Sequence, residues 1–345
     1  MNRDSTRPAE MIHHAFSDSL TKANQSRLGV LSDLLRRTSD SVRYVDYRQA
    51  ECDCEQLAAS ILHIYSHHEL ESFSFTAIPR GGSIVLGMLS YVLDLQPAQL
   101  EVDLVSPRPL VIVDDCALSG HRFADFLSKT SSSHVVFVHL YSHPNLRQAI
   151  LSRESRVKHC LAAHDLTDHA SEYYQIPAEY QAWQNRWQQR LGANRYWFGQ
   201  SDPVCFAWSE PEYQFWNEEM ERLESGWHFL APHRCLKNKW NLGLPPKGLS
   251  KREWRVTASV VSGWFDGMLW LCQTHTHQVY SLTGLSADMW RTLAVYGDMN
   301  VAAEYLLSEY AVDPKTLRRD LSAFAKELLA AQLLEKTSES LHLDT

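Results

Sequence analysis

Two neighbouring carboxylates, Asp114 and Asp115, follow an apolar run and precede a short loop that contains Ser119 and Gly120. Paired carboxylates offer hydrogen-bond acceptors that suit the two vicinal hydroxyls of a ribose. A Ser-Gly loop that opens a helix gathers free backbone N–H groups around one point, which suits a phosphate. These residue types in this order predict a site for a sugar phosphate. An ordinary buried strand that ends in an Asp-Asp turn is the alternative.

A second loop of similar character lies upstream, in the sequence Ile78-Pro79-Arg80-Gly81-Gly82. Gly81 and Gly82 allow the backbone to approach an anion closely, and Arg80 offers charge-assisted hydrogen bonds. A tight strand-to-helix turn that merely needs glycine is the alternative interpretation.

The elements around both loops predict an α/β fold with a parallel sheet, because short apolar runs alternate with segments of helical periodicity. The predicted strands are Phe73–Ile78, Leu110–Val113, His134–Leu140 and Val157–Ala162, and the predicted helices are Cys54–His68, Ser83–Leu93, a segment after Gly120 and Leu146–Leu151. Ligands of such sheets bind beyond the carboxyl ends of the strands. Both loops fall there.

The two loops resemble those of type I phosphoribosyltransferases, which bind 5-phosphoribosyl-1-pyrophosphate (PRPP). The resemblance implies that Asp114 and Asp115 hold the ribose hydroxyls, that the loop up to Arg122 wraps the 5′-phosphate, and that the upstream loop holds the pyrophosphate. The implied PRPP-binding residues are Arg80, Gly81, Gly82, Asp114, Asp115, Ala117, Leu118, Ser119, Gly120, His121 and Arg122. Arg122 departs from the family pattern, which has Thr there. It either supplies charge to the phosphate or indicates a different ligand preference.

The same resemblance implies Mg²⁺ as a cofactor near Asp114 and Asp115, held mostly through PRPP and water. The implied catalytic residues are Asp114, Asp115, Arg80 and Asp165. Asp165 follows the last predicted strand, where it would accept a proton or a hydrogen bond from the incoming nucleophile. A capped helix start is the alternative at that position.

The C-terminal part has a different pattern, in which three short strand-like runs precede three helical segments. The runs are VTASVV, GMLWLC and QVYSL, and the helices are expected at Ala287–Val295, Val301–Glu309 and Pro314–Leu333. Asp313 before Pro314 is a good helix N-cap. The stretch Val279–Trp290 resembles PqqD-like proteins, which recognise precursor peptides of ribosomally made, modified products. The resemblance implies that a leader peptide adds a strand along Gln278, Val279, Tyr280, Ser281 and Leu282. A generic winged helix is the alternative.

Charge argues against a nucleic-acid partner, since the chain carries a net charge of −8. From Arg255 to the end, eleven acidic residues oppose seven basic ones, a poor surface for DNA. No apolar stretch predicts a membrane span or a signal peptide, which favours a cytoplasmic protein. The seven cysteines suggest reduced thiols, with a metal site at Cys52 and Cys54 as a weak alternative.

Taken together, the sequence predicts an α/β type I phosphoribosyltransferase fold joined to a small α+β winged-helix-like domain. The expected divisions are an N-terminal extension that contributes to a hood (1–40), the phosphoribosyltransferase-like domain (41–200), an aromatic-rich connecting or hood segment (201–254) and the PqqD-like domain (255–340). The expected function is PRPP-dependent transfer in the maturation of a peptide. The alternative is a catalytically silent sensor of PRPP or a nucleotide that recruits a protein or DNA partner.

Overall fold

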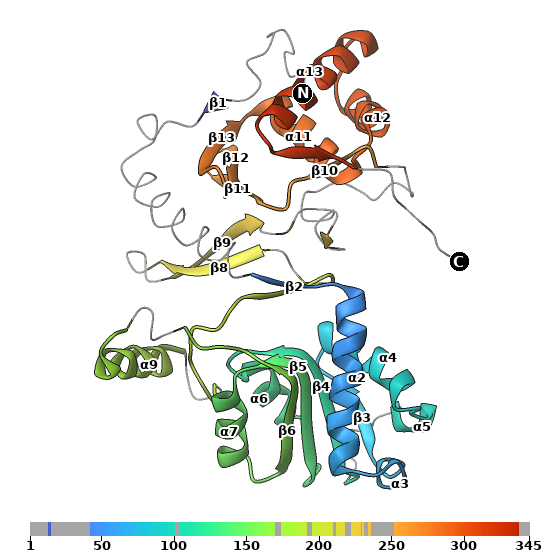
Figure 1. Ribbon diagram of the computed structural model, residues 1–345, viewed down its shortest axis with the longest axis vertical. Helices are drawn as coiled ribbons and strands as arrows, with labels where there is room; N and C mark the ends of the chain where they lie inside the picture. Colours follow the sequence, from blue (N-terminus) through green and yellow to red (C-terminus); the bar gives the residue numbers. More distant parts are fainter. Residues whose placement is uncertain are drawn as a thin grey trace. The chain divides into compact units, whose positions relative to one another are not determined.

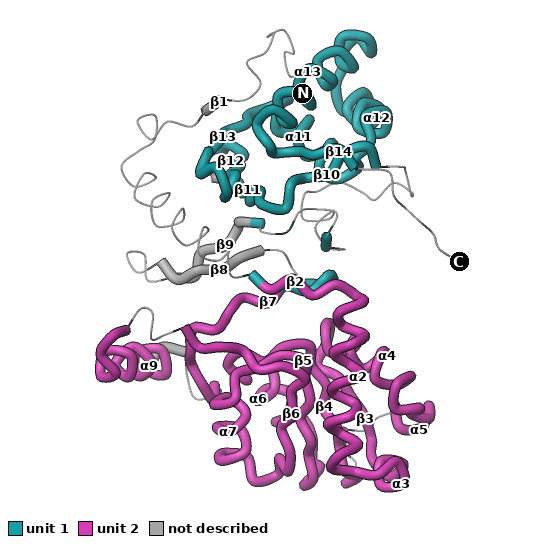
Figure 2. The backbone as a smooth tube through the Cα atoms, viewed as in Figure 1, with its two compact units in different colours: residues 1–42, 205–345 teal, residues 43–204 magenta. Residues whose placement is uncertain are grey.

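The chain divides into two compact units, which are described separately (Figure 2). Unit 1 comprises residues 1–42 and 205–345, and unit 2 comprises residues 43–204. The computed structural model describes residues 13–14, 42–100, 104–105, 107–169, 174–191, 195–209, 212–217, 222–228, 230, 234–235, 252–265 and 267–337.

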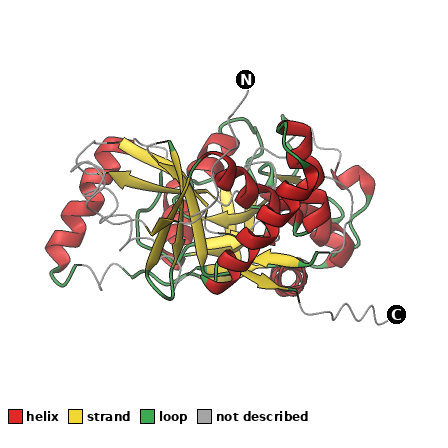
Figure 3. Cartoon of the chain, turned by 90° about the horizontal axis from the view of Figure 1, so that it is seen from above, coloured by secondary structure: helices red, strands yellow, loops and turns green. Residues whose placement is uncertain are grey.

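Unit 2 alternates strands and helices along the chain, as predicted (Figure 1). Figure 3 distinguishes the helices from the strands of the whole chain by colour. Its strands are β2 (Arg43–Val45), β3 (Ser74–Ala77), β4 (Leu110–Ala117), β5 (Val135–Ser142) and β6 (Val157–Asp165). Its helices are α2 (Tyr47–Ile64), α3 (His67–Leu70), α4 (Gly81–Val92), α5 (Pro97–Leu100), α6 (His121–Leu127), α7 (Pro144–Arg153) and α9 (Pro177–Leu191).

The central sheet of unit 2 has the order β3-β4-β5-β6, and all three neighbouring pairs are parallel. Every residue of β5 is buried, which fits its largely apolar sequence. On one face, Phe123 of α6 stacks on Phe137 of β5 with ring centroids 4.0 Å apart. Leu146 and Ile150 of α7 join the same core. The sheet and its crossover helices confirm the predicted α/β class.

Helix α2 begins earlier than the predicted Cys54, because Asp46 caps it. The Asp46 side chain accepts a hydrogen bond of 2.8 Å from the backbone N–H of Gln49. The buried face of the helix carries Ala50, Asp53, Cys54, Leu57, Ala58 and Ile61 at helical spacing. A carboxylate, Asp53, lies in that otherwise apolar face.

Unit 1 contains a six-stranded sheet with the order β1-β13-β12-β11-β9-β8. Its strands are β1 (His13–His14), β8 (Glu212–Asn217), β9 (Arg222–His228), β11 (Val260–Phe265), β12 (Met268–Gln273) and β13 (Gln278–Leu282). A separate antiparallel pair joins β10 (Trp254–Val256) to β14 (Leu334–Lys336). The unit boundary falls within β7 (Val204–Phe206).

Three helices follow β13 in the predicted order: α11 (Gly284–Tyr296), α12 (Met299–Glu309) and α13 (Pro314–Ala330). The predicted N-cap is confirmed, since Asp313 accepts a hydrogen bond of 2.8 Å from the N–H of Thr316. Met289 and Trp290 are each 1% exposed and lie in one apolar core with Leu271 of β12 and Phe324 of α13.

One expectation for unit 1 was wrong. The predicted strand-like run VTASVV ends at Val261, whereas β11 continues to Phe265, and the turn that follows contains Gly267, whose φ of 74° suits glycine. The role of segment 201–254 as a connection or part of a hood stays a prediction. Within this segment, β8 and β9 form an antiparallel hairpin that extends the sheet of unit 1, with Ser262 opposite His228 and Gly263 opposite Trp227.

Candidate PRPP site

The two carboxylates lie within β4 and not after it, which corrects the predicted strand end at Val113. Strand β3 is paired with β4 only as far as Ala77 opposite Val113, whereas β5 stays paired with β4 to Ala117. Asp114 is 2% exposed and Asp115 is 8% exposed. The N–H of Asp115 donates to Asp114 Oδ1 at 2.9 Å, and the N–H of Cys116 donates to Asp115 Oδ1 at 2.8 Å. Both carboxylates are thus held in place by backbone amides beyond the end of β3.

The upstream loop lies directly against these carboxylates. A Cβ added to Gly81 would stand 1.6 Å from Asp115 Oδ2, and one added to Gly82 would stand 2.4 Å from the carbonyl oxygen of Val113. The preceding peptide bond, Pro79–Arg80, is cis, and Arg80 is exposed at the start of α4. The fold brings these two loops together, and glycine is required at Gly81 and Gly82 because no side chain fits there.

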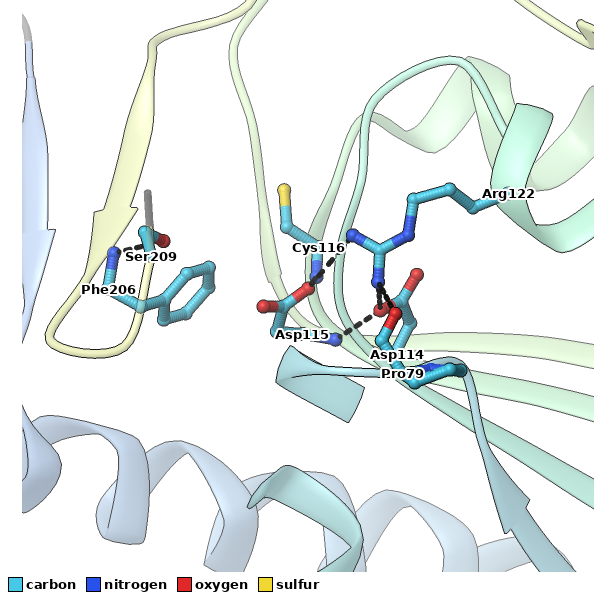
Figure 4. A network of polar contacts seen from close by, with 7 residues as sticks. All are labelled: Pro79, Asp114, Asp115, Cys116, Arg122, Phe206 and Ser209. Atoms are coloured by element: carbon cyan, nitrogen blue, oxygen red, sulfur yellow. Dashed lines mark hydrogen bonds and ion pairs between the residues drawn. The ribbon is translucent and has the colours of Figure 1, made fainter. Parts of the chain in front are cut away.

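Arg122 joins the two loops from the start of α6 (Figure 4). Its Nη2 lies 2.7 Å from Asp114 Oδ1, and its Nη1 lies 3.8 Å from Asp115 Oδ1. The same Nη2 approaches the carbonyl oxygen of Pro79 at 3.5 Å. The guanidinium therefore neutralises the acidic pair, a role that sequence reasoning did not foresee for the residue that replaces the usual Thr.

Opposing influences act on the Asp114 carboxyl. Burial raises its pKa most, and the charge of Asp115 raises it further, while Arg122 lowers it; the net pKa is about 8. A carboxyl whose pKa is higher in the folded than in the unfolded protein stabilises the fold below its unfolded pKa. That stabilisation is lost as the pH rises towards the folded pKa.

Replacement of Asp114 by Asn is therefore expected to make unfolding less sensitive to pH. Relative to Asp114→Asn, the unchanged protein should lose up to about 1.4 kcal/mol of stability per pH unit between about pH 5 and pH 8, and little more above that. Denaturant unfolding of both proteins across this range measures the difference. The exposed Asp94, whose φ of 51° Asn also tolerates, provides the control Asp94→Asn. Parallel pH profiles for Asp114→Asn and the unchanged protein would contradict the expectation.

The predicted phosphate loop runs from Ala117, the last residue of β4, through exposed Leu118 to Gly120, whose φ is 76°. Tyr196 holds it from outside, since its N–H donates to the carbonyl oxygen of Ser119 at 2.9 Å. A Cβ on Gly120 would lie 2.6 Å from the Tyr196 ring. Helix α6, which follows this loop, spans seven residues.

His121 completes this loop with an incompletely satisfied imidazole. Its Nε2 lies 3.4 Å from Asp125 Oδ2, one turn further along α6. Its Nδ1 is buried and has no hydrogen-bond partner in the described part of the chain. A buried ring nitrogen without a partner is costly, and a bound anion or water would satisfy it.

Asp165 is the last residue of β6, and the capped helix start considered for this position is absent from residues 166–169. Its Oδ1 pairs with Arg147 Nη2 at 2.6 Å. Arg147 Nη1 also donates to the side-chain and backbone oxygens of Ser142, at 2.9 Å and 3.1 Å. Asp165, which was predicted to accept a proton or a hydrogen bond from the nucleophile, is therefore engaged in an ion pair at the carboxyl end of the sheet.

The neighbouring residue, His164, belongs to a buried cluster that the sequence did not predict. Asp53 of α2, 1% exposed, accepts hydrogen bonds from Gln49 at 2.8 Å, from Tyr141 at 2.5 Å and from His164 Nε2 at 2.7 Å. The imidazole of His164 also stacks on the ring of Tyr141. The strand register aligns Cys116, Tyr141 and His164 across β4, β5 and β6. A carboxylate that orients an imidazole is an arrangement suited to proton transfer.

Metal ligands are sparse among the described residues, which hold no group of three or more His, Cys, Asp or Glu side chains placed for an ion. Cys52 is exposed and Cys54 is buried, so the two thiols of the C-x-C pair do not point to a common site. Asp114 and Asp115 suit Mg²⁺ that is already bound to phosphate oxygens better than they suit a permanently bound ion. The reason is that Arg122 already forms an ion pair with Asp114.

In the C-terminal unit, the five residues predicted to bind a peptide form β13. Tyr280 and Leu282 are buried, whereas Gln278 is exposed and Val279 and Ser281 are half-buried. One edge of β13 pairs along its whole length with β12. The other edge carries β1, with His13 opposite Ser281 and His14 opposite Tyr280. None of the helices in the described residues has the length and apolar character that a bilayer span requires.

Comparison with known proteins found one matching family model and several similar solved structures. The family model of PqqD, coenzyme PQQ synthesis protein D, matches residues 270–334. A search of curated proteins found no match. A solved structure of TbiB1 in complex with the TbiA(beta) leader peptide is 26% identical over 25% of this chain and 99% of its own, with a TM-score of 0.23.

Two solved phosphoribosyltransferases are also similar to this chain. The purine phosphoribosyltransferase of Pyrococcus horikoshii Ot3 is 18% identical over 30% of this chain and 80% of its own, with a TM-score of 0.24. A hypoxanthine-guanine-xanthine phosphoribosyltransferase is 14% identical over 37% of this chain and 85% of its own, with a TM-score of 0.24.

The parallel sheet with its two adjoining loops defines unit 2 as an α/β unit. The antiparallel sheet and the helices that follow define the second part, and residues 270–334 match PqqD. The chain thus joins an α/β unit to a part that matches PqqD, which confirms the PqqD resemblance drawn from the sequence.

Proposed function

We propose that this protein transfers a phosphoribosyl group from PRPP during the maturation of a ribosomally made peptide. The observation that carries the proposal is the close approach of Gly81 to Asp115, where a Cβ would stand 1.6 Å from the carboxylate. It joins a loop suited to pyrophosphate with carboxylates suited to a ribose, which is the combination that PRPP needs.

The residues of unit 2 divide the ligand among them. Asp114 and Asp115 accept hydrogen bonds from the ribose hydroxyls, and the loop from Ala117 to Arg122 surrounds the 5′-phosphate. The unpartnered Nδ1 of His121 supports an anion near that loop. Arg80, Gly81 and Gly82 receive the pyrophosphate, which leaves with the electron pair of its bond to C1. The acceptor then bonds to C1 and releases a proton.

Mg²⁺ bound to the pyrophosphate would neutralise charge on the leaving group. Asp114 and Asp115 would hold it mostly through PRPP and water. Arg122, already beside both carboxylates, limits their mutual repulsion when the anionic ligand arrives.

Two groups compete for the acceptor's proton. Asp165 is the residue expected from the sequence, but its carboxylate is paired with Arg147. His164, one residue earlier, is oriented by buried Asp53 and is partly exposed, so its imidazole is the second candidate. An imidazole that a carboxylate orients can act as a general base.

The PqqD-type unit would supply the peptide. A leader that adds a strand along Gln278–Leu282 uses main-chain hydrogen bonds, so recognition depends little on its side chains. Tethering the peptide in this way raises the local concentration of acceptor at the sugar-phosphate site.

Mass spectrometry tests the proposal directly. A candidate precursor peptide is incubated with the full chain, PRPP and Mg²⁺, and a mass gain of one phosphoribosyl group is expected. The control replaces PRPP with ribose 5-phosphate, which lacks the leaving group and should give no gain. An unmodified peptide, with PRPP bound by the protein, would contradict transfer.

That second outcome would favour a PRPP or nucleotide sensor that recruits a partner through its C-terminal unit. One observation points in this direction, because Arg122 occupies the carboxylate that should receive a ribose hydroxyl. A sensor would keep the binding site and need no acceptor.

A further inference from the structure

The outer edge of β13 is partly covered by the chain's own N-terminal segment. Strand β1 runs antiparallel to β13 and pairs His13 with Ser281 and His14 with Tyr280 (Figure 1). Because β12 pairs with the opposite edge of β13, the β1 side is the edge at which a further strand can add. That edge is the one assigned above to a precursor leader.

We infer that the segment containing His13 and His14 is an internal competitor that a precursor leader displaces from the edge of β13. The leader's role rests on the proposed function; occupation of the edge by β1 does not. An edge offers one row of N–H and C=O groups, so two strands cannot pair with the same residues at once. The competition follows from this geometry.

The length of the pairing makes the exchange possible. Strand β1 pairs with two of the five residues of β13, namely Tyr280 and Ser281. A leader in extended conformation can pair with all five and form more main-chain hydrogen bonds. The internal strand therefore excludes weak or short peptides, and a longer strand replaces it.

Tethering sets the size of the effect. An attached segment competes at an effective concentration of about 1 mM. If its own dissociation constant is about 0.1 mM, a peptide added in trans binds about tenfold more weakly than to an open edge.

A labelled peptide with the sequence of residues 8–20 tests this inference, because it carries the internal strand itself and requires no knowledge of the natural leader. Binding is followed by fluorescence polarisation to the full chain and to a His13→Pro, His14→Pro variant, which lacks both strand N–H groups. The variant should bind the probe about tenfold more tightly. The matched His13→Ala, His14→Ala variant keeps the amides and should behave like the unchanged protein. Equal binding by all three would overturn the inference.

A cross-link provides a second measurement that does not depend on proline. Directly opposed residues of antiparallel strands have Cα atoms about 4.5–5.5 Å apart, within the range of about 4.4–6.8 Å for a disulfide. A His13→Cys, Ser281→Cys variant should therefore form a disulfide on oxidation and stop binding the probe, and reduction should restore binding. Failure to cross-link, or unchanged binding after cross-linking, would overturn the inference. Neither assay contains PRPP, so the result is independent of phosphoribosyl transfer.

Discussion

The double substitution Asp114→Asn, Asp115→Asn is expected to abolish PRPP-dependent modification of the peptide. Each carboxyl group accepts a hydrogen bond from a ribose hydroxyl in the proposed complex, and a buried group left without its partner costs about 1–3 kcal/mol. Loss of both predicts a fall in PRPP affinity of about 10²–10⁴-fold. Calorimetric titration with PRPP and Mg²⁺ measures the affinity, and mass spectrometry measures the product.

The expected loss of PRPP affinity and product does not result from unfolding of the double variant. Asp114 is buried and its pKa is raised to about 8, so a neutral amide replaces a group that the fold already prefers in its neutral form. The exposed variant Asp94→Asn should leave both binding and product unchanged. Modification that persists in the double variant, at the rate of the unchanged protein, would rule out the assigned ribose site.

The elements of unit 2 could be predicted because their signals are local. Apolar runs such as Leu110–Val113 indicate buried strands, and glycines at the start of the next segment indicate a turn. Alternation then places Asp114 and Gly81 at the same edge of a parallel sheet. The adjacency of the two loops therefore followed from topology, without knowledge of any side-chain contact.

The contacts that complete the site depend on residues far apart in the sequence. Asp53 and His164 are 111 positions apart, and only the packing of α2 on the sheet brings them within 2.7 Å. Tyr196 reaches Ser119 in the same way. The sequence could assign Arg122 to the predicted phosphate loop. It could not predict that the Arg122 side chain turns to Asp114, because that contact depends on the charges that the fold brings together. Periodicity carries no information about such pairs.

The β8–β9 hairpin was missed for a different reason. Its sequence is aromatic and polar without clear alternation, so neither strand period nor turn chemistry was evident. Only the pairing of Trp227 and His228 with β11 assigns it to the C-terminal sheet. Strand pairing between distant segments is a tertiary property, and the two-residue β1 is an extreme case of it.

A single methyl group at Gly81 is expected to remove PRPP binding, whereas the same methyl at Gly87 of the same helix should be harmless. In Gly81→Ala the new Cβ would overlap Asp115 Oδ2 at 1.6 Å and Cγ at 2.3 Å. Asp115 would have to leave the N–H of Cys116, to which it is bound at 2.8 Å, or the start of α4 would have to move. Either shift separates the pyrophosphate loop from the ribose carboxylates, and we expect PRPP affinity to fall at least about a hundredfold, the equivalent of about 2.8 kcal/mol.

Gly87 provides the matched control because a Cβ there meets nothing within 4 Å. In Gly87→Ala the helix should gain about 0.5–1 kcal/mol of stability and keep its affinity for PRPP, since alanine favours helix interiors. Gly82→Ala distinguishes an effect on folding from an effect on ligand binding, because its Cβ would meet the backbone of Val113 and not a carboxylate. Thermal unfolding and PRPP titration of the three variants check these expectations. If Gly81→Ala binds PRPP as tightly as Gly87→Ala does, Asp115 does not contact the ribose, and the proposed division of the ligand between the two loops is wrong.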